Sequence, residues 1–469
     1  MTVVVASCTV AKLFSGETFE ASDGTLIEGN LHLPEYQRPY RWGEAQIRRL
    51  LEDLRRYFCP PHPGSSPAHL FYLGSIILHQ DGEGRLNIID GQQRLTTMAL
   101  LMWQQAPGSE PKLRYESPLS HAQIRKNQEW LKQQENWNRA WLKLERINIT
   151  VVVTRSEDDA YCFFETQNTG GVRLSGPDII KAHHLRATPR SRQDRYARLW
   201  ESLGDLNPVV DAVLKARSWN ALNFRHVPSR REPLSVRETV VTELAENTGE
   251  GHADVAYGLT ATSRTPDGAV VQVAHADGYA MRQPLNAGIN SIHYLEYFES
   301  LRRILLTNHR EPDLDSFHNF YQGLIVGRQG CSYLKKLYDS CLLLYASHFG
   351  RSQLFEASLR LFRVVYAPRV TNEKTVKEAT ASKFVRENPV FDWILMSYTH
   401  EQCMERLRLF EVKVSAKNLG QSDDGVKKRF VQAVNEWFSL ELPKDRMAEQ
   451  YDDALQKAIK STLEVVNHG

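Results

Sequence analysis

The stretch IIDGQQRLTTMALL, from Ile88 to Leu101, passes from an apolar, strand-like run through an Asp-Gly turn into a helix-forming run. Polar side chains crowd the corner between the two runs: Asp90, Gln92, Gln93 and Arg94. As plain structure, Asp-Gly is a common turn and Asp90 could cap the helix. As a site, Gly91 would let a ligand approach the backbone, the first helical N–H groups would face an anion, and Arg94 could fork onto phosphate oxygens. Both interpretations stay open from this stretch alone.

The site interpretation assigns a chemical role to each polar group. Asp90 could hold Mg²⁺ or a ribose hydroxyl, and either glutamine could orient water or a phosphate oxygen. The corner is not a Walker A loop, because G-x-x-x-x-G-K-[ST] occurs nowhere in the chain. Two apolar runs lead into it, FYLGSIILHQ (71–80) and RLNIID (85–90), and the residues between them, Asp81-Gly82-Glu83-Gly84, tolerate positive φ. This pattern predicts a hairpin that feeds the helix.

Further upstream, LPEYQRPYRW (33–42) follows GTLIEGNLHLPEY (24–36), whose alternation predicts a strand. Ten residues hold two arginines, a glutamine, two tyrosines and a tryptophan. The aromatic rings could simply close one end of the core while Arg38 and Arg41 point to water. Alternatively, the strand end presents Arg38 to a phosphate and its aromatic residues to a base or sugar: Tyr36, Tyr40 and Trp42.

The bulk composition is that of a globular protein. A chain of 469 residues is too long for one ordinary core, so we expect at least two domains. A net charge of +2 gives no general attraction to nucleic acid, so any DNA contact needs a local patch. The six cysteines form no C-x-x-C pair, which argues against a structural zinc site or a disulfide framework and favours the cytoplasm. No apolar run reaches the length of a spanning helix, and the N-terminal MTVVVASCTV reads as a strand rather than a signal peptide.

The order of patterns along the chain predicts an α+β N-terminal part and a mainly helical C-terminal part. Helical spacing covers 43–58, the segment after Gln92 and about 119–145, and NITVVVT (148–154) supplies another strand. Residues 156–187 predict two helices joined by a glycine turn. We expect three regions: 1–225, a nucleotide-binding domain with a helical extension; 226–284, an irregular insert or linker; and 285–469, a helical domain.

Four motifs in a fixed order resemble the N-terminal domain of the GmrSD-type modification-dependent restriction family. They are LPEYQRPYRW, FYLGSIIL, IIDGQQRLTT and FETQNTGGVRLSGPDIIKAHHL (164–185). The resemblance covers roughly residues 20–190. It implies a fold similar to that of ParB and sulfiredoxin, with a small mixed sheet and a nucleotide-binding corner.

The resemblance also implies that residues of these motifs surround one nucleoside triphosphate bound with Mg²⁺ or Mn²⁺: Gln37, Arg38, Asp90, Gly91, Gln92, Gln93, Arg94 and Asn168. Of these we expect Asp90, Gln93 and Arg94 to act in catalysis, with Asp90 holding the metal, and the others to bind the nucleotide. The aromatic residues of the first motif would line this pocket or an adjoining one for modified DNA. Asp178 and Lys181 would brace their helix.

The C-terminal half departs from the family pattern. Full-length single-chain members carry an HNH-type nuclease with an EHIxPQ-like run, and no such run occurs here. We therefore expect an NTPase of antiviral defence that senses foreign or modified phage DNA and acts with a separate nuclease or effector subunit, without a membrane partner. The alternative is a non-catalytic adaptor that binds nucleotide or DNA and recruits the effector.

Overall fold

The computed structural model describes residues 3–59, 70–106, 108, 111, 113–134, 141–156, 159–160, 176–251, 253–257, 260–264, 266–268, 270–274, 278–307, 310–372, 376–417, 419, 425–442 and 447–468. The chain divides into two compact units, Met1–Ser202 and Leu203–Gly469. Each unit has its own hydrophobic core, so each is described by itself.

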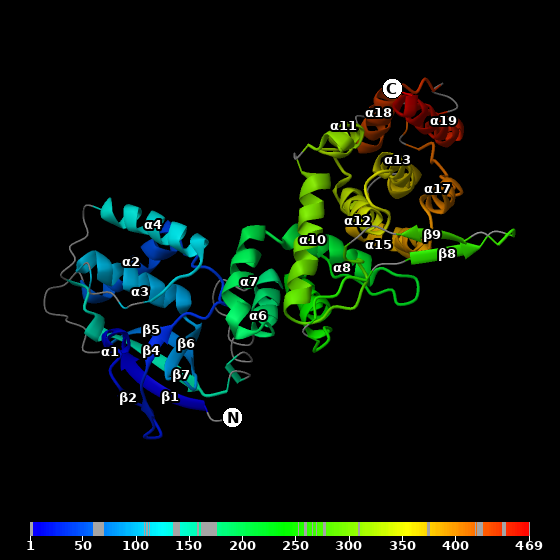
Figure 1. Ribbon diagram of the computed structural model, residues 1–469. Helices are drawn as coiled ribbons and strands as arrows, with labels where there is room; N and C mark the ends of the chain where they lie inside the picture. The colour runs from blue at the N-terminus through cyan, green and yellow to red at the C-terminus, as the bar shows by residue number, and fades with distance from the viewer. Residues whose placement is uncertain are drawn as a thin grey trace. The chain divides into compact units, whose positions relative to one another are not determined.

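A five-stranded mixed sheet organises the first unit (Figure 1). Its order is β1 (Val3–Thr9), β7 (Ile147–Thr154), β5 (Phe71–Gln80), β6 (Arg85–Asp90) and β4 (Asn30–His32). β1 and β7 are antiparallel, β7 and β5 parallel, β5 and β6 antiparallel, and β6 and β4 parallel. The small mixed sheet, the N-terminal strand and the β5–β6 hairpin are therefore confirmed. Two short strands, β2 (Phe19–Glu20) and β3 (Leu26–Ile27), pair beside it.

Helices α2 (Glu44–Phe58), α3 (Gln92–Gln105) and α4 (Pro118–Lys132) gather on one side of the sheet, and α1 (Val10–Ser15) follows β1 (Figure 1). Alternate residues of β7 are buried, which gives the sheet an apolar face for this layer. The predicted continuous helix over about 119–145 is confirmed as far as Lys132, but among the described residues beyond it 133–134 and 142–143 are not helical. A 3₁₀ turn at Leu144–Arg146 leads into β7 instead, and Leu142 and Leu144 alternate into the core, which a helix could not arrange.

Two further helices complete the first unit, α6 (Gly176–Arg186) and α7 (Arg190–Leu203). Pro177 lies at the second position of α6, as predicted for a helix start. The predicted glycine turn and most of the helix before it lie outside the described residues. The start of that helix is described: Asp159 and Ala160 are helical, and Ser156 Oγ accepts from the Asp159 N–H at 3.2 Å, as predicted for its cap. Lys181 of α6 donates hydrogen bonds from Nζ to Gln37 O and to Glu201 Oε1 of α7, both at 3.1 Å. This buried lysine ties both helices to the segment that follows β4.

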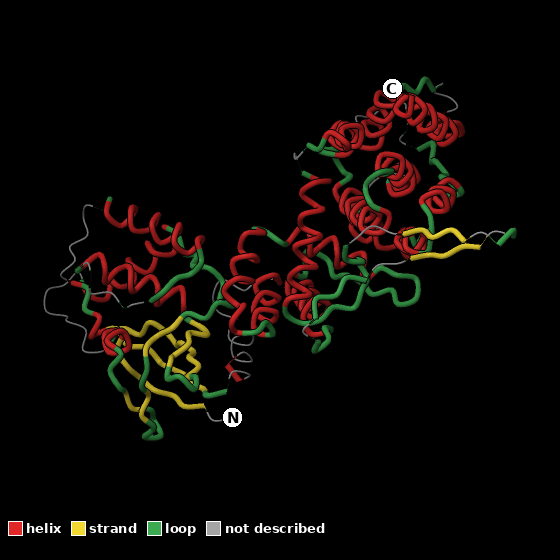
Figure 2. The backbone as a smooth tube through the Cα atoms, in the orientation of Figure 1, coloured by secondary structure: helices red, strands yellow, loops and turns green. Residues whose placement is uncertain are grey.

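The second unit is mainly helical, as expected, and in Figure 2 its only yellow strands among the described residues form one hairpin, between helices and connecting loops. The hairpin pairs β8 (Thr260–Arg264) with β9 (Val270–Ala274). The helices are α8 (Asn207–Ser218), α9 (Pro233–Val241), α10 (Ile289–Leu306), α11 (Asp315–Phe320), α12 (Ser332–Phe349), α13 (Leu354–Val365), α14 (Ala367–Thr371), α15 (Glu378–Glu387), α16 (Val390–Leu395), α17 (His400–Arg408), α18 (Val426–Phe438) and α19 (Met447–His468). α12 is buried along most of its length and forms the centre of this unit.

The predicted region boundaries at residues 225 and 284 stay predictions. Regular elements occur within 226–284, namely α9, a π-helical turn at Thr242–Glu246 and the β8–β9 hairpin. Within the described ranges, none of the helices has the length and apolar character needed to cross a membrane.

Candidate functional site

The corner between β6 and α3 requires glycine. Gly91 has φ 95°, in the left-handed region, and caps the N-terminus of α3. A Cβ at this position would overlap Ile76 Cγ2 and lie 3.0 Å from Ile76 Cβ, so the backbone packs directly on β5. In the described part of the chain no side chain caps α3, so the N–H groups of its first turn have no partner of that kind.

Arg94 is held by the sheet and by Asp90. Its Nη2 donates to Ser75 O at 2.7 Å and to Asp90 Oδ2 at 3.2 Å, and its Nη1 donates to Leu73 O at 3.4 Å. The guanidinium therefore fixes the Asp90 carboxylate, which is 30% exposed. The Arg94–Asp90 pair orients the carboxylate through its Oδ2 atom. The other oxygen, Asp90 Oδ1, has no hydrogen bond among the described residues.

The two glutamines beside it differ. Gln93 Oε1 accepts from the backbone N–H groups of Arg41 at 2.8 Å and Trp42 at 3.2 Å, and its Nε2 donates to Pro39 O at 3.2 Å. Gln92, equally buried, leaves its Oε1 without a partner among the described residues. Gln93 thus acts as a clamp, because its side chain joins the IIDGQQRLTT motif to the LPEYQRPYRW motif. Gln92 is the glutamine whose side-chain oxygen can still accept a hydrogen bond from a ligand.

The residues of the LPEYQRPYRW segment differ in burial and in hydrogen-bond partners. Gln37 Nε2 donates to Ile89 O at 2.8 Å, which anchors the segment to the end of β6. Tyr40 is 1% exposed; its hydroxyl hydrogen-bonds Thr97 Oγ1 at 2.8 Å and accepts from Asn127 Nδ2 at 3.3 Å. Its ring is therefore part of the core. Trp42 is partly buried against the same core, and Tyr36 is half-buried.

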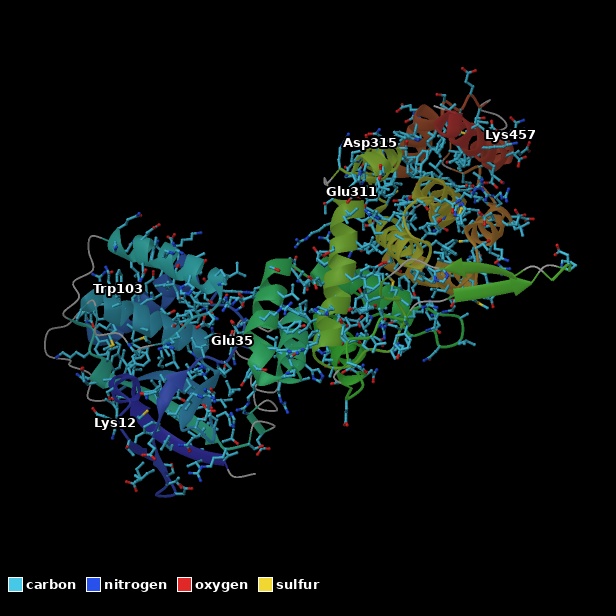
Figure 3. The ribbon with its side chains drawn as sticks, in the orientation of Figure 1. Lys12, Glu35, Trp103, Glu311, Asp315 and Lys457 are labelled. Atoms are coloured by element: carbon cyan, nitrogen blue, oxygen red, sulfur yellow. The ribbon has the colours of Figure 1, made fainter. Side chains whose placement is uncertain are left out.

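A pocket of about 320 Å³ lies between this segment, the start of α3, the chain before α4 and α7. Arg38 and Gln92 line it, together with residues that the motifs do not single out, among them Glu35, Arg114, Tyr115, Glu116 and Glu201. Glu35 is marked in Figure 3, in the loop after β4. The structure thus brings Gln37, Arg38 and Gln92 into one pocket. Asp90 and Arg94 do not line it, and the charge of Asp90 acts on Arg38.

Arg38 is a half-buried cation of this pocket. Burial lowers the pKa of its guanidinium, and the carboxylates of Asp178 and Asp90 oppose that shift. Arg38 makes no hydrogen bond or ion pair with any residue that the structure describes. Asp178 instead pairs with the more exposed Arg41 at 3.4 Å. A half-buried guanidinium without an anion is costly, so a negatively charged ligand would stabilise it.

Acidic side chains also line this pocket. Burial raises the pKa of Glu35 to about 7, the carboxylates of Asp194 and Glu116 add to the effect, and Lys181 opposes it. Glu201 leaves its Oε2 without a partner among the described residues, while its Oε1 pairs with Lys181. Sequence reasoning missed these carboxylates. Glu35 lies inside a motif but was not singled out in it, and Glu201 comes from a helix that no motif covers.

Two further expectations concern Asn168 and a metal ion. Asn168 lies outside the described residues. No group of three His, Cys, Asp or Glu side chains suited to a metal occurs among the residues that the structure covers. Mg²⁺ bound with a nucleotide needs only one or two carboxylates besides phosphates, however, and the free Oδ1 of Asp90 fits that donor set.

Residues 16–185 match the family model described as "GmrSD restriction endonuclease, N-terminal domain". This part of the chain is a GmrSD-type N-terminal domain. The GmrSD-type domain contains every strand of the five-stranded sheet except β1, the β6–α3 corner and every pocket residue named above except Glu201. A second model, described as "Family of unknown function (DUF7834)", matches residues 192–422, which begin within α7 and run through most of the helical unit. No curated protein matches the chain.

Proposed function

We propose that this protein is an anti-phage restriction component that binds a nucleoside triphosphate in the pocket lined by Arg38 and Gln92. Hydrolysis of the nucleotide would be coupled to sensing of foreign or modified DNA. The unpaired, half-buried Arg38 carries the proposal, because a nucleotide phosphate would supply the anion that the described residues do not. The restriction family of the domain supports DNA as the partner.

Each corner residue then has a distinct part. Arg38 contacts phosphate oxygens, and the N-terminus of α3 adds the favourable end of its dipole. Asp90 holds Mg²⁺ through its free oxygen, and Arg94 keeps that carboxylate in position. A bound Mg²⁺ would neutralise phosphate charge. Gln93 positions the segment that carries Arg38, rather than contacting the ligand itself.

The test is phosphate release from ATP, GTP, CTP and UTP with Mg²⁺, in the presence and absence of modified and unmodified DNA. Arg38→Ala and Asp90→Ala should each lower turnover on the order of 100-fold, because each removes a charged contact where phosphate charge develops. Arg41→Ala is the matched control, since Arg41 is exposed, pairs with Asp178 and does not line the pocket.

The outcomes separate the proposed enzyme from its alternative. Turnover that needs Arg38 and Asp90 but not Arg41 supports an NTPase, and its DNA dependence identifies the trigger. Nucleotide binding without turnover would favour the adaptor. Turnover unchanged in Arg38→Ala would contradict the assignment of this pocket.

A further inference from the structure

Two buried acceptor atoms in the pocket have no donor. Gln92 Oε1 and Glu201 Oε2 each lack a hydrogen-bond partner among the described residues. The Gln92 residue is 7% exposed and the Glu201 side chain 9%, and both line the pocket. Buried polar atoms are almost always hydrogen-bonded, so two unpartnered acceptors in one cavity point to donors that a ligand supplies.

Two neighbouring donors, Lys181 and Tyr115, are already engaged. Lys181 Nζ is bonded to Glu201 Oε1 and to Gln37 O. The hydroxyl of Tyr115 donates to Thr96 Oγ1 at 2.9 Å. Since these bonds hold their donors away from the two free acceptors, repacking of these side chains would break one bond to make another.

We propose that the pocket recognises a guanine base, with Gln92 Oε1 and Glu201 Oε2 accepting hydrogen bonds from its N1–H and 2-amino groups. This inference rests on the proposed nucleotide site and adds its base preference. Guanine presents two neighbouring N–H donors on one edge. Adenine and cytosine present an amino group beside a ring-nitrogen acceptor, and uracil presents one N–H between two carbonyls, so each would leave an acceptor facing an acceptor.

The remaining features of the pocket fit this ligand. The exposed Arg114 lines the same cavity and can donate to the guanine O6. Arg38 stays available for phosphate.

Competition binding of GTP, ITP, ATP and XTP with Mg²⁺ to the full chain tests the proposal. ITP lacks the 2-amino group, so GTP should bind about tenfold more tightly than ITP, and on the order of 100-fold more tightly than ATP. Glu201→Gln should shift the preference from GTP toward XTP, because an amide can donate to the 2-carbonyl of xanthine. Glu52→Gln, the same change at an exposed carboxylate of α2 that does not line the pocket, should leave the GTP preference within about twofold.

The comparison of the four nucleotides uses the wild-type protein, so it does not depend on the folding of a variant. Equal affinity for all four nucleotides, together with loss of binding in Arg38→Ala, would overturn the guanine assignment and leave the nucleotide site standing. An unchanged ratio of GTP to XTP affinity in a folded Glu201→Gln would also overturn it. Absence of binding by every nucleotide would overturn both proposals.

Discussion

Gln93 Oε1 accepts a hydrogen bond from the backbone N–H of Arg41 at 2.8 Å. The bond joins the corner after β6 to the segment after β4, and the Gln93 amide reinforces it by donating to Pro39 O. Because Arg38 directly precedes these anchored residues, the clamp fixes the position of the segment that carries Arg38. The two motifs are therefore one structural unit.

Gln93→Leu should lower the free energy of unfolding by about 2–4 kcal/mol, since it leaves buried backbone groups of the segment without partners. Gln92→Leu is the matched control, because Gln92 is adjacent and equally buried but has an unpartnered Oε1. It should change stability by less than about 1 kcal/mol. Urea unfolding of both variants measures the difference, and equal losses would refute the distinction between clamp and ligand-facing glutamine.

Gly91→Ala should destabilise the first unit by more than about 2 kcal/mol, because a Cβ there meets Ile76 and the backbone is left-handed. Gly84 has φ 75° but open space around a Cβ, so Gly84→Ala should cost only about 1 kcal/mol. The thermal midpoints of the two variants compare them. A cost for Gly91→Ala no larger than that for Gly84→Ala would mean that the close approach of the corner to β5 is not real.

Glu35 predicts a pH effect on stability. Its pKa is raised from 4.5 to about 7 by burial and by the carboxylates of Asp194 and Glu116. The folded state therefore holds a proton that the unfolded state releases, so this contribution to stability is lost as pH rises from about 4.5 through 7. Glu35→Gln should remove that loss. Its stability relative to wild type should increase between about pH 5 and pH 8; a pH-independent difference would argue against the raised pKa.

Local pattern was enough to predict the hairpin β5–β6, the helix α3 and the helix α2, because each depends on periodicity and turn residues within its own segment. The end of α4 was not predictable in this way. Residues beyond Lys132 have helical composition, but Leu142, just before the 3₁₀ turn that leads into β7, and Leu144, within that turn, are both buried in the core. Tertiary packing decided that boundary.

The site was predictable only in part for a related reason. The motifs brought Arg38 and Gln92 to attention, and they lie in one pocket. Composition could not show that Tyr40 packs in the core or that the side-chain amide of Gln93 hydrogen-bonds to backbone groups. Glu201 reaches the pocket from α7, more than a hundred residues away in sequence, through its ion pair with Lys181. Such a contact has no local signature.

Equilibrium binding of a fluorescent nucleoside triphosphate with Mg²⁺, compared between Arg38→Ala and Arg41→Ala, tests the central claim most directly. Arg38→Ala should weaken binding by about 10- to 100-fold, since it removes the charge-assisted contact to phosphate. Arg41→Ala should stay within about threefold of wild type, because its charge is exposed and screened. Equal affinities for the Arg38→Ala variant and the wild-type protein would contradict the account.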